Sequence, residues 1–543
     1  MDQQIPSSDQ SISVQQEEPR LPETRHLSHL AHAVVSVFER KEFPNHEPKI
    51  TVNRFLSEIA TWYEKLRNSM DLRDDEVVLK SAIERILKRR LLLGGDGKRV
   101  AEPLLRELIW AHYFPNGTLP ESMTPKIAHA IDLYLALRHH AIEEGMKEND
   151  LNEWTFQVLS CHLARLLSPN VEKNTMSNFM YHIMKDRLQI KDDSEDTKNV
   201  QVYLAVRRSF AKDDIAFLRF YLFQQIFGEL SADNLEHVQR AFIKGYEEIE
   251  KQLKYPLKEK IYLSIKRITP VFFILEDVLR KEKDHTRTLL QDPEAFKKEV
   301  FAACQVRYKG IRSKVTRAII RSVIFLLITK AIIALGVEGT YDRFIYGHVM
   351  YGSIALNVGI PPLLMIIVSF FIKTPGDDNS ERILDKIHQV LYDSEPQITP
   401  IKVLMLNPPK TRSVLTTVFA SLGIAAFVVS FGLIIYILNA LHFNIVSQAI
   451  FIFFITIVSF LAYRINLTAH EYTVEAKQGL LTPFIDFLII PIVRVGMRLT
   501  EGISQINIIV FIFDFLIEAP FKAIFGFFEQ FFSYLHTGRE ELG

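Results

Sequence analysis

Cysteine is scarce in this chain: Cys161 and Cys304 are the only two, and they lie far apart in the sequence. A disulfide framework is therefore not expected, and a reducing compartment is favoured for residues 1–300. An excess of charge of either sign is also absent, because 64 Lys and Arg balance 64 Asp and Glu. That balance removes the global electrostatic case for nucleic acid, and no nucleic-acid partner is predicted.

A targeting signal is absent from the beginning of the sequence. Residues 1–24 contain Gln, Ser, Pro and Glu without an apolar run, which is typical of a disordered tail rather than a secretion signal. Acidic residues such as Asp2, Asp9 and Glu17 also argue against an organellar transit peptide, which would be poor in acids.

Apolar residues are concentrated in the second part of the chain. Residues 1–300 carry charges throughout, whereas residues 318–535 are dominated by Ile, Leu, Val and Phe. This shift in composition predicts an all-α protein in which a soluble helical domain precedes a helical membrane domain.

The soluble domain is predicted to span residues 25–300. Its apolar residues recur at spacings of three and four, as in "VNRFLSEIATWYEKLRNSM", which is typical of amphipathic helices around a core. No run of alternating strand residues stands out, and no fixed-period repeat is visible. The polar stretch 191–198 is a candidate seam between two helical subdomains.

Catalytic patterns are also lacking. The Gly-Lys pair in "LLLGGDGKRV" has the wrong spacing for a phosphate loop, and a glycine at the end of a helix followed by a turn is favoured instead. His26, His29 and His32 are three apart without acids at ligand spacing, so a surface helix is favoured over a metal site. No catalytic residue, cofactor or metal site is predicted, and an enzyme is not favoured.

Long uncharged runs predict four membrane spans, arranged as two hairpins. Two are clear, 413–438 and 445–463, because each is long enough to cross about 30 Å of hydrocarbon at 1.5 Å per residue. A third, 350–372, carries no charge but contains Pro361 and Pro362. The fourth, 318–337, has Lys330 near its middle, and an interfacial helix is its alternative.

Basic residues set the predicted orientation. A membrane-surface basic cluster lies in and after a juxtamembrane helix at 301–317, and the loop 373–412 is also rich in Lys and Arg. The positive-inside rule then places both termini and this loop in the cytoplasm of a bacterial-type inner membrane or its equivalent. The cluster consists of Arg307, Lys309, Arg312, Lys314, Arg317 and Arg321.

Charges within apolar surroundings are the candidate functional residues of the membrane domain, residues 318–472, and of the C-terminal part that follows it. A lysine at the centre of a membrane helix costs free energy. Lys330 is therefore expected either to extend its side chain to the membrane surface or to pair with another group inside the bundle. Asp514 is the favoured partner. The candidate intramembrane charges are Lys330, Asp486, Arg494, Asp514 and Glu518.

Residues 473–543 predict re-entrant or interfacial amphipathic helices rather than further spans. The last of them has an aromatic face typical of a helix in the membrane interface, or of one that covers a groove of the protein itself. That face includes Phe521, Phe525, Phe528 and Phe532. Another short amphipathic segment, "SERILDKIHQVLYDSE" in the 373–412 loop, is expected to dock on the soluble domain or on the bundle.

Two hypotheses for function follow. The favoured one is a membrane-anchored helical scaffold or adaptor that presents a cytoplasmic domain, with the lipid bilayer and a protein as its partners. The alternative is a transporter or channel component that uses the intramembrane charges. A homo-oligomer is compatible with either hypothesis, because small residues on span 413–438 permit close helix contact.

Overall fold

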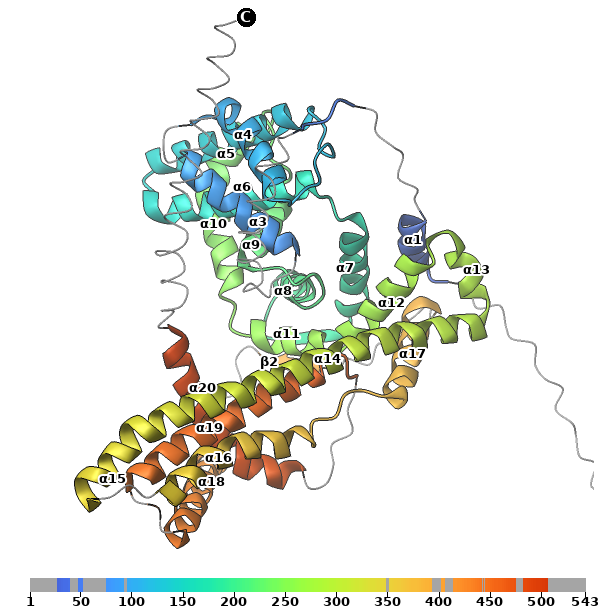
Figure 1. Ribbon diagram of the computed structural model, residues 1–543. Helices are drawn as coiled ribbons and strands as arrows, with labels where there is room; N and C mark the ends of the chain where they lie inside the picture. The colour runs from blue at the N-terminus through green and yellow to red at the C-terminus, as the bar shows by residue number, and fades with distance from the viewer. Residues whose placement is uncertain are drawn as a thin grey trace, which may run out of the picture. The chain divides into compact units, whose positions relative to one another are not determined.

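The computed structural model describes residues 27–39, 47–51, 75–91, 95–347, 351–392, 402–405, 414–441, 443, 445–474 and 482–505. As predicted, the fold is all-α, with two very short strands. The chain divides into two compact units: residues 1–305 with 377–408, and residues 306–376 with 409–543. Figure 1 labels the elements of both units.

The first unit has its main hydrophobic core among six helices. These are α3 (Asp75–Leu91), α4 (Gly97–Trp110), α5 (Met123–Glu143), α6 (Glu148–Leu167), α9 (Ile215–Phe227) and α10 (Leu235–Leu253). Trp154 is an aromatic centre of this core and contacts Phe223 and Phe242 edge to face. Edge-to-face contacts add to the stabilisation that burial of apolar area supplies.

The other described helices within residues 1–305 of the first unit have 3 to 14 residues, apart from α14, of which only the first turns belong to this unit. They are α1 (His29–Phe38), α7 (Val171–Met184), α8 (Glu195–Val206), η1 (Arg207–Ala211), α11 (Lys258–Lys266), α12 (Thr269–Lys281), η2 (Lys283–His285), α13 (Thr286–Gln291) and the first turns of α14 (Pro293–Ile333). Several begin at a side-chain cap: Ser28, Asn170 and Ser194 each accept a hydrogen bond from a backbone N–H three residues on. Such caps satisfy donors that have no partner within the helix.

A segment from the predicted 373–412 loop completes the first unit. Helix α17 (Asp377–Tyr392) packs on α12 and α1, and its apolar side chains Ile383 and Ile387 are fully buried. Strand β2 (Lys402–Met405) pairs in parallel with β1 (Leu188–Lys191), which lies beside the predicted seam. Periodicity predicted the helix, whereas the pairing of β1 and β2 was not foreseen because four-residue strands leave no periodic pattern.

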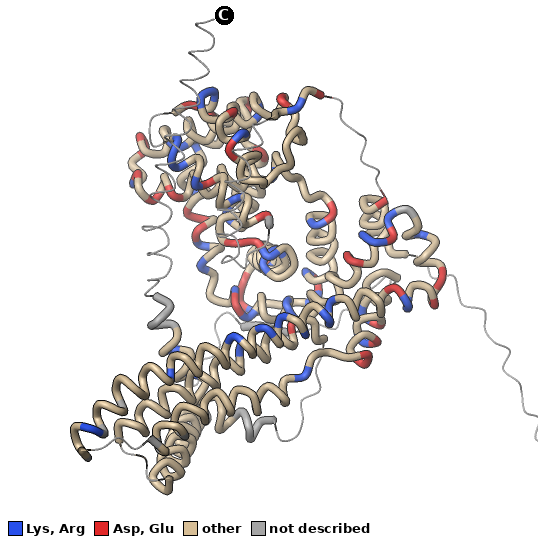
Figure 2. Tube along the Cα trace, viewed as in Figure 1, with Lys and Arg blue, Asp and Glu red and all other residues tan. Residues whose placement is uncertain are grey.

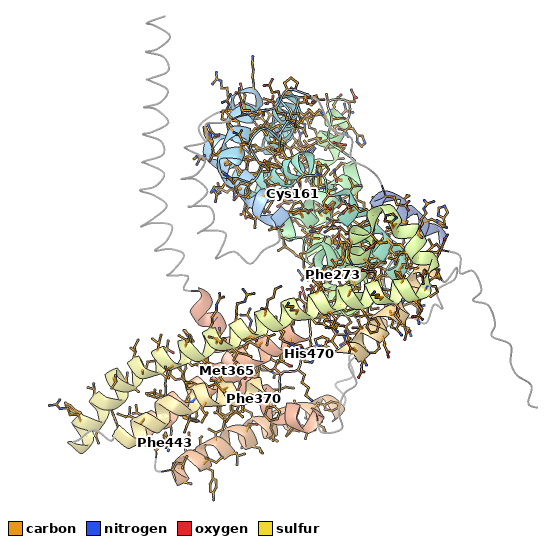
Figure 3. All side chains as sticks on the ribbon, turned by 45° about the vertical axis from the view of Figure 1, so that its right-hand side comes forward. Cys161, Phe273, Met365, Phe370, Phe443 and His470 are labelled. Atoms are coloured by element: carbon orange, nitrogen blue, oxygen red, sulfur yellow. The ribbon has the colours of Figure 1, made fainter. Side chains whose placement is uncertain are left out.

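The second unit is a bundle of long apolar helices. It contains the later part of α14, η3 (Ala334–Glu338), α15 (Gly339–Tyr346), α16 (Tyr351–Ser369), α18 (Val414–Ala440), α19 (Ile445–Ala469) and α20 (Thr482–Gln505). Figure 3 shows Phe443 and His470 at opposite ends of α19. Phe443 packs with Leu438 and Phe451 where α18 and α19 meet, and Ile360 of α16 joins them.

Three helices in the described part of the chain are long and apolar enough to cross a membrane: Pro293–Ile345, Thr417–Ala440 and Ile445–Ala469. The prediction of four spans is therefore not confirmed. Segment 318–337 belongs to the first of these helices. Segment 350–372 is not among the three; within the described residues it contributes the shorter apolar helix Asn357–Ser369.

The C-terminal predictions fall partly outside the described residues. Helix α20 is continuous through Pro491 and packs along α18 and α19. Ser430 of α18 donates a hydrogen bond to the carbonyl of Leu488, and Gly496 lies so close to the carbonyl of Thr456 that a Cβ would be only 2.0 Å away. Small residues permit this close approach of helices. The tail 1–24 and residues 506–543 lie outside the described part.

Candidate functional site

The most elaborate polar cluster of the first unit surrounds Arg207. This side chain is 1% exposed and forms an ion pair of 2.5 Å with Asp213, which is equally buried. Its other nitrogens donate to Asn174 Oδ1 at 2.9 Å and to Tyr221 Oη at 2.5 Å, and the guanidinium lies 4.0 Å from the centre of the Tyr221 ring. Arg207 is the first residue of η1, and α7 and α9 supply partners for its charged side chain.

The local backbone explains how Arg207 and Asp213 meet. Element η1 is a π-helix, whose wider turn accommodates an extra residue, and Lys212 follows it in the left-handed conformation with φ of 61°. This turn brings the amide of Asp213 back to the carbonyl of Arg207 at 3.3 Å. π-Helical turns are frequent at functional sites, which makes this cluster a candidate.

The electrostatics indicate a structural role for the cluster. Burial opposes the charge of Arg207, but Asp213, together with Tyr221 and Tyr203, more than offsets this and raises the pKa of the guanidinium. Three protein groups already accept hydrogen bonds from Arg207, so its donors are engaged within the protein. The arrangement fixes α7, η1 and α9 to one another, and at 1% exposure the guanidinium is not accessible to a substrate.

A small pocket of about 150 Å³ lies beside this cluster. Its polar lining is paired within the protein: Arg208 bonds Glu259 at 3.0 Å, and Gln201 donates to Gln252. No group of three or more His, Cys, Asp or Glu in the described ranges could hold a metal ion. The pocket therefore offers no convergent set of unsatisfied polar groups.

The Gly-Lys pair rejected as a phosphate loop begins a helix rather than ending one. Asp96 is the N-cap of α4 and accepts a hydrogen bond from the Arg99 amide at 2.8 Å. The amide of Gly97 donates to Asp132 at 2.7 Å, and a Cβ at Gly97 would clash with the carbonyl of Ala128. Helix α3 ends at Leu91, and the predicted glycine helix end falls on residues 92–94, which lie outside the described part. Carboxylates occupy the positions that a phosphate would take.

His162 is the buried histidine of the main core. It stacks on Phe220, contacts Tyr134 edge to face, and has Glu229 at 3.8 Å. Burial lowers the pKa of its imidazole, and the charge of Glu229 offsets this only in part. Its Nδ1 has no hydrogen-bond partner among the described residues. No sequence pattern singles out His162, because its neighbours come from helices distant in the chain.

We expect acid to destabilise the first unit through His162. A histidine whose pKa is lower in the folded state binds its proton more readily when unfolded, so stability is lost as the pH falls below about 6.5. The free energy of unfolding should change by at most about 1.4 kcal/mol per pH unit through this one histidine. The emission of Trp110 and Trp154 would follow unfolding, since every tryptophan of the chain lies in the first unit.

The variant His162→Phe should flatten this pH dependence and retain the ring stacking. His139→Gln is the matched control, because His139 is largely exposed. An unchanged slope in His162→Phe would assign the acid sensitivity to other groups.

Lys330 lies inside the second unit. Its side chain is 0% exposed, and its Nζ is 4.8 Å from the centre of the Phe454 ring of α19. Together with a hydrogen bond of 2.7 Å from Arg307 to Tyr472 Oη, this contact places α14 antiparallel to α19. Lys330 is thus turned into the bundle and does not extend along its outer surface.

We expect a measurable coupling between Lys330 and Phe454. A desolvated cation over an aromatic ring is worth about 2 kcal/mol, and a double-mutant cycle isolates that contribution. Lys330→Met and Phe454→Leu should therefore give a combined loss smaller than the sum of the single losses when detergent-solubilised protein is unfolded by SDS.

The pair Arg464 and Phe460 provides the control for this cycle, because Arg464 is exposed and lies 5.9 Å from the ring. Its coupling should stay below about 1 kcal/mol. Strict additivity for Lys330 and Phe454 would mean that the ring does not stabilise the cation.

The other candidate charges are not brought together with Lys330 by the described contacts. Arg494 and Arg498 are exposed on α20, while Asp486 lies in α20 without a described side chain. Asp514 and Glu518 lie outside the described residues, as do Phe521, Phe525, Phe528 and Phe532. The pairing of Lys330 with Asp514 therefore stays a prediction.

The basic cluster is mostly exposed. Arg307 is the exception, because it is half-buried against Tyr472, with 5.3 Å between its guanidinium and the ring centre. The remaining members face outward from α14: Lys309, Arg312, Lys314, Arg317 and Arg321. Figure 2 shows basic residues along this part of α14.

Comparison with known proteins gives no match: no protein-family model, curated protein or solved structure resembles this chain significantly.

Proposed function

We propose that this protein is a membrane-anchored helical scaffold or adaptor, in which four spans hold a helical domain at one face of the membrane. The observation that carries the proposal is the incorporation of α17 and β2 into the first unit. The chain passes between the two units three times, at residues 305–306, 376–377 and 408–409. A domain that only needed a tether would require one such passage.

The contacts of α17 support this attachment. Tyr392 Oη donates to the carbonyl of Leu290 at 2.9 Å, and the amide of Ser28 donates to the carbonyl of Leu391 at 2.8 Å. His388 stacks on Phe296 of α14. Because Ile383, Ile387 and Val390 are also buried, α17 is packed into this unit and is not an appended surface helix.

This packing also supports four spans. Residues 1–305 and 377–408 form one compact unit, so they lie on the same side of the membrane and the chain between them crosses an even number of times. Since α14 is a candidate span, α16 must return the chain. Helix α16 has 19 residues, and at 1.5 Å per residue it nearly matches the hydrocarbon thickness. Helices α18 and α19 then form the second hairpin.

We expect cysteine labelling to give this topology. In full-length protein with Cys161 and Cys304 replaced by alanine, Asp378→Cys should react only from the side of the first unit. Phe344→Cys and Leu441→Cys should react only from the opposite side, because these exposed positions lie at the far ends of the hairpins. Labelling of positions 344 and 378 from the same side would show that α16 does not cross.

A transporter or channel component is the second candidate function, and Lys330 is the observation that favours it. Ionisable residues inside a membrane bundle are costly and frequently mark ion pathways. Ion flux in proteoliposomes that depends on Lys330 would favour this candidate over the scaffold. Incorporated protein without flux would support the scaffold.

A further inference from the structure

The second unit carries a belt of exposed cations on three helices. On α14 these are Lys314, Arg317 and Arg321, preceded by Lys309 and Arg312. Arg464 is exposed near the end of α19, and Lys373 is exposed just after α16. The sequence alone could not show that these residues lie near one level, because they come from distant segments.

The level of Arg464 follows from the contacts between α14 and α19. Arg307 meets Tyr472, and Lys330 meets Phe454, so the two helices run side by side in opposite directions. Arg464 is ten residues after Phe454 on α19, and the residue ten positions before Lys330 on α14 is Ile320. Arg464 therefore lies near the height of Arg317 and Arg321, within about one helical turn.

Lys373 reaches a similar level. Ile354 of α16 lies against Gly339, where a Cβ would be 4.0 Å from its Cδ1. Lys373 follows Ile354 by 19 residues, and the residue 19 positions before Gly339 is Ile320, next to Arg321. Three helices thus bring cations to one end of the bundle.

This belt borders an outward-facing apolar surface. Immediately beyond it on α14, Ile324, Phe325 and Ile328 are about half exposed. Phe370 and Phe371, close to Lys373, are 79% and 77% exposed. Aromatic side chains at this border are typical of the level at which hydrocarbon meets lipid headgroups.

The belt also lacks neutralising acids on its principal helix. The sequence contains no Asp or Glu between Glu299 and Glu338, and none in 445–469, the length of α19. The guanidinium groups present forked donors that match phosphate oxygens. Clusters of four to eight basic residues next to a membrane span are typical of sites for anionic lipids.

We propose that this belt binds the phosphate headgroups of anionic phospholipids and enriches them around the bundle. Each cation at the membrane surface increases the partitioning of an anionic lipid on the order of fivefold at low ionic strength. The inference rests on the proposed membrane topology and adds a lipid class to it. A lipid is favoured over a soluble anion as the bound group, because the cations border the exposed apolar surface.

The test uses the full chain in vesicles of phosphatidylcholine with a trace of spin-labelled phosphatidylglycerol or spin-labelled phosphatidylcholine. Electron spin resonance measures the fraction of each label immobilised by the protein. We expect phosphatidylglycerol to be preferred by at least about threefold at low salt, and by much less at about 1 M salt, where screening is strong.

Two triple variants distinguish the effect of the belt on lipid preference from the effect of the protein's net charge. Lys314→Gln/Arg317→Gln/Arg321→Gln should lose most of the preference. Lys297→Gln/Lys298→Gln/Arg343→Gln removes the same charge from exposed positions away from the belt and should retain it. Failure of the wild type to incorporate would overturn the topology itself, whereas incorporation without preference would overturn only the lipid inference.

Equal preference in both triple variants would also overturn the inference. Inorganic phosphate, added at constant ionic strength, should leave the preference unchanged. Its abolition by inorganic phosphate would assign the belt to a soluble anion instead of a lipid.

Discussion

A fragment of residues 27–305, produced without residues 377–408, is expected to be only partly folded. Helix α17 buries five apolar side chains in the first unit, and burial of each contributes about 1.5–3 kcal/mol as an upper estimate. Their sum is comparable with the whole net stability of a typical domain, about 5–15 kcal/mol. The five are Ile383, Leu384, Ile387, Val390 and Leu391.

The loss should be local. The main core among α3–α6, α9 and α10 includes no residue of α17, so these helices should retain protection from hydrogen exchange. Helices α1 and α12, which α17 contacts, should exchange rapidly. The sequence predicted a soluble domain of residues 25–300, and the compact unit of the structure also includes residues 377–408.

Adding residues 377–408 in trans should restore protection in α1 and α12. Peptides with Ile387→Asp should fail to do so, because they place a charge in the core. Peptides with Gln389→Asp should succeed, since Gln389 is exposed. Full protection of the fragment without any peptide would show that α17 is dispensable for the unit.

Breaking the ion pair between Arg207 and Asp213 is expected to have the second large effect. Arg207→Met leaves the Asp213 carboxylate buried without its cation, and such single replacements cost about 3–5 kcal/mol. Asp213→Asn should destabilise similarly, because it leaves the guanidinium uncompensated. The double variant should recover much of the loss, since no unpaired charge then stays buried.

Tryptophan emission of the detergent-solubilised full chain during urea unfolding would measure these changes. Arg240→Met is the matched control, because Arg240 forms an exposed ion pair with Glu236 on α10. Its effect should stay within about 1 kcal/mol. A loss of that small size for Arg207→Met, or additive losses in the double variant, would contradict a tightly coupled buried pair.

The sequence by itself determined the class of this protein. Apolar spacing of three and four predicted the helices of the first unit, and uncharged runs predicted α18 and α19, because helical periodicity and membrane length are local properties. The amphipathic pattern of "SERILDKIHQVLYDSE" likewise predicted a docked helix. The exposure of most residues of the basic cluster could also be predicted locally, since charged side chains are rarely buried away from water.

The tertiary structure decided which segments meet. Local pattern left the destination of α17 open between two domains, and only packing against α1, α12 and α14 assigned it to the first. Packing also brought Lys330 to Phe454, Arg207 to Tyr221, and Arg464 to the level of Arg317. A side chain's periodicity shows which face is buried, but its partner depends on the long-range packing of segments hundreds of residues apart. For that reason the class could be predicted from sequence, whereas the contacts between distant segments could not.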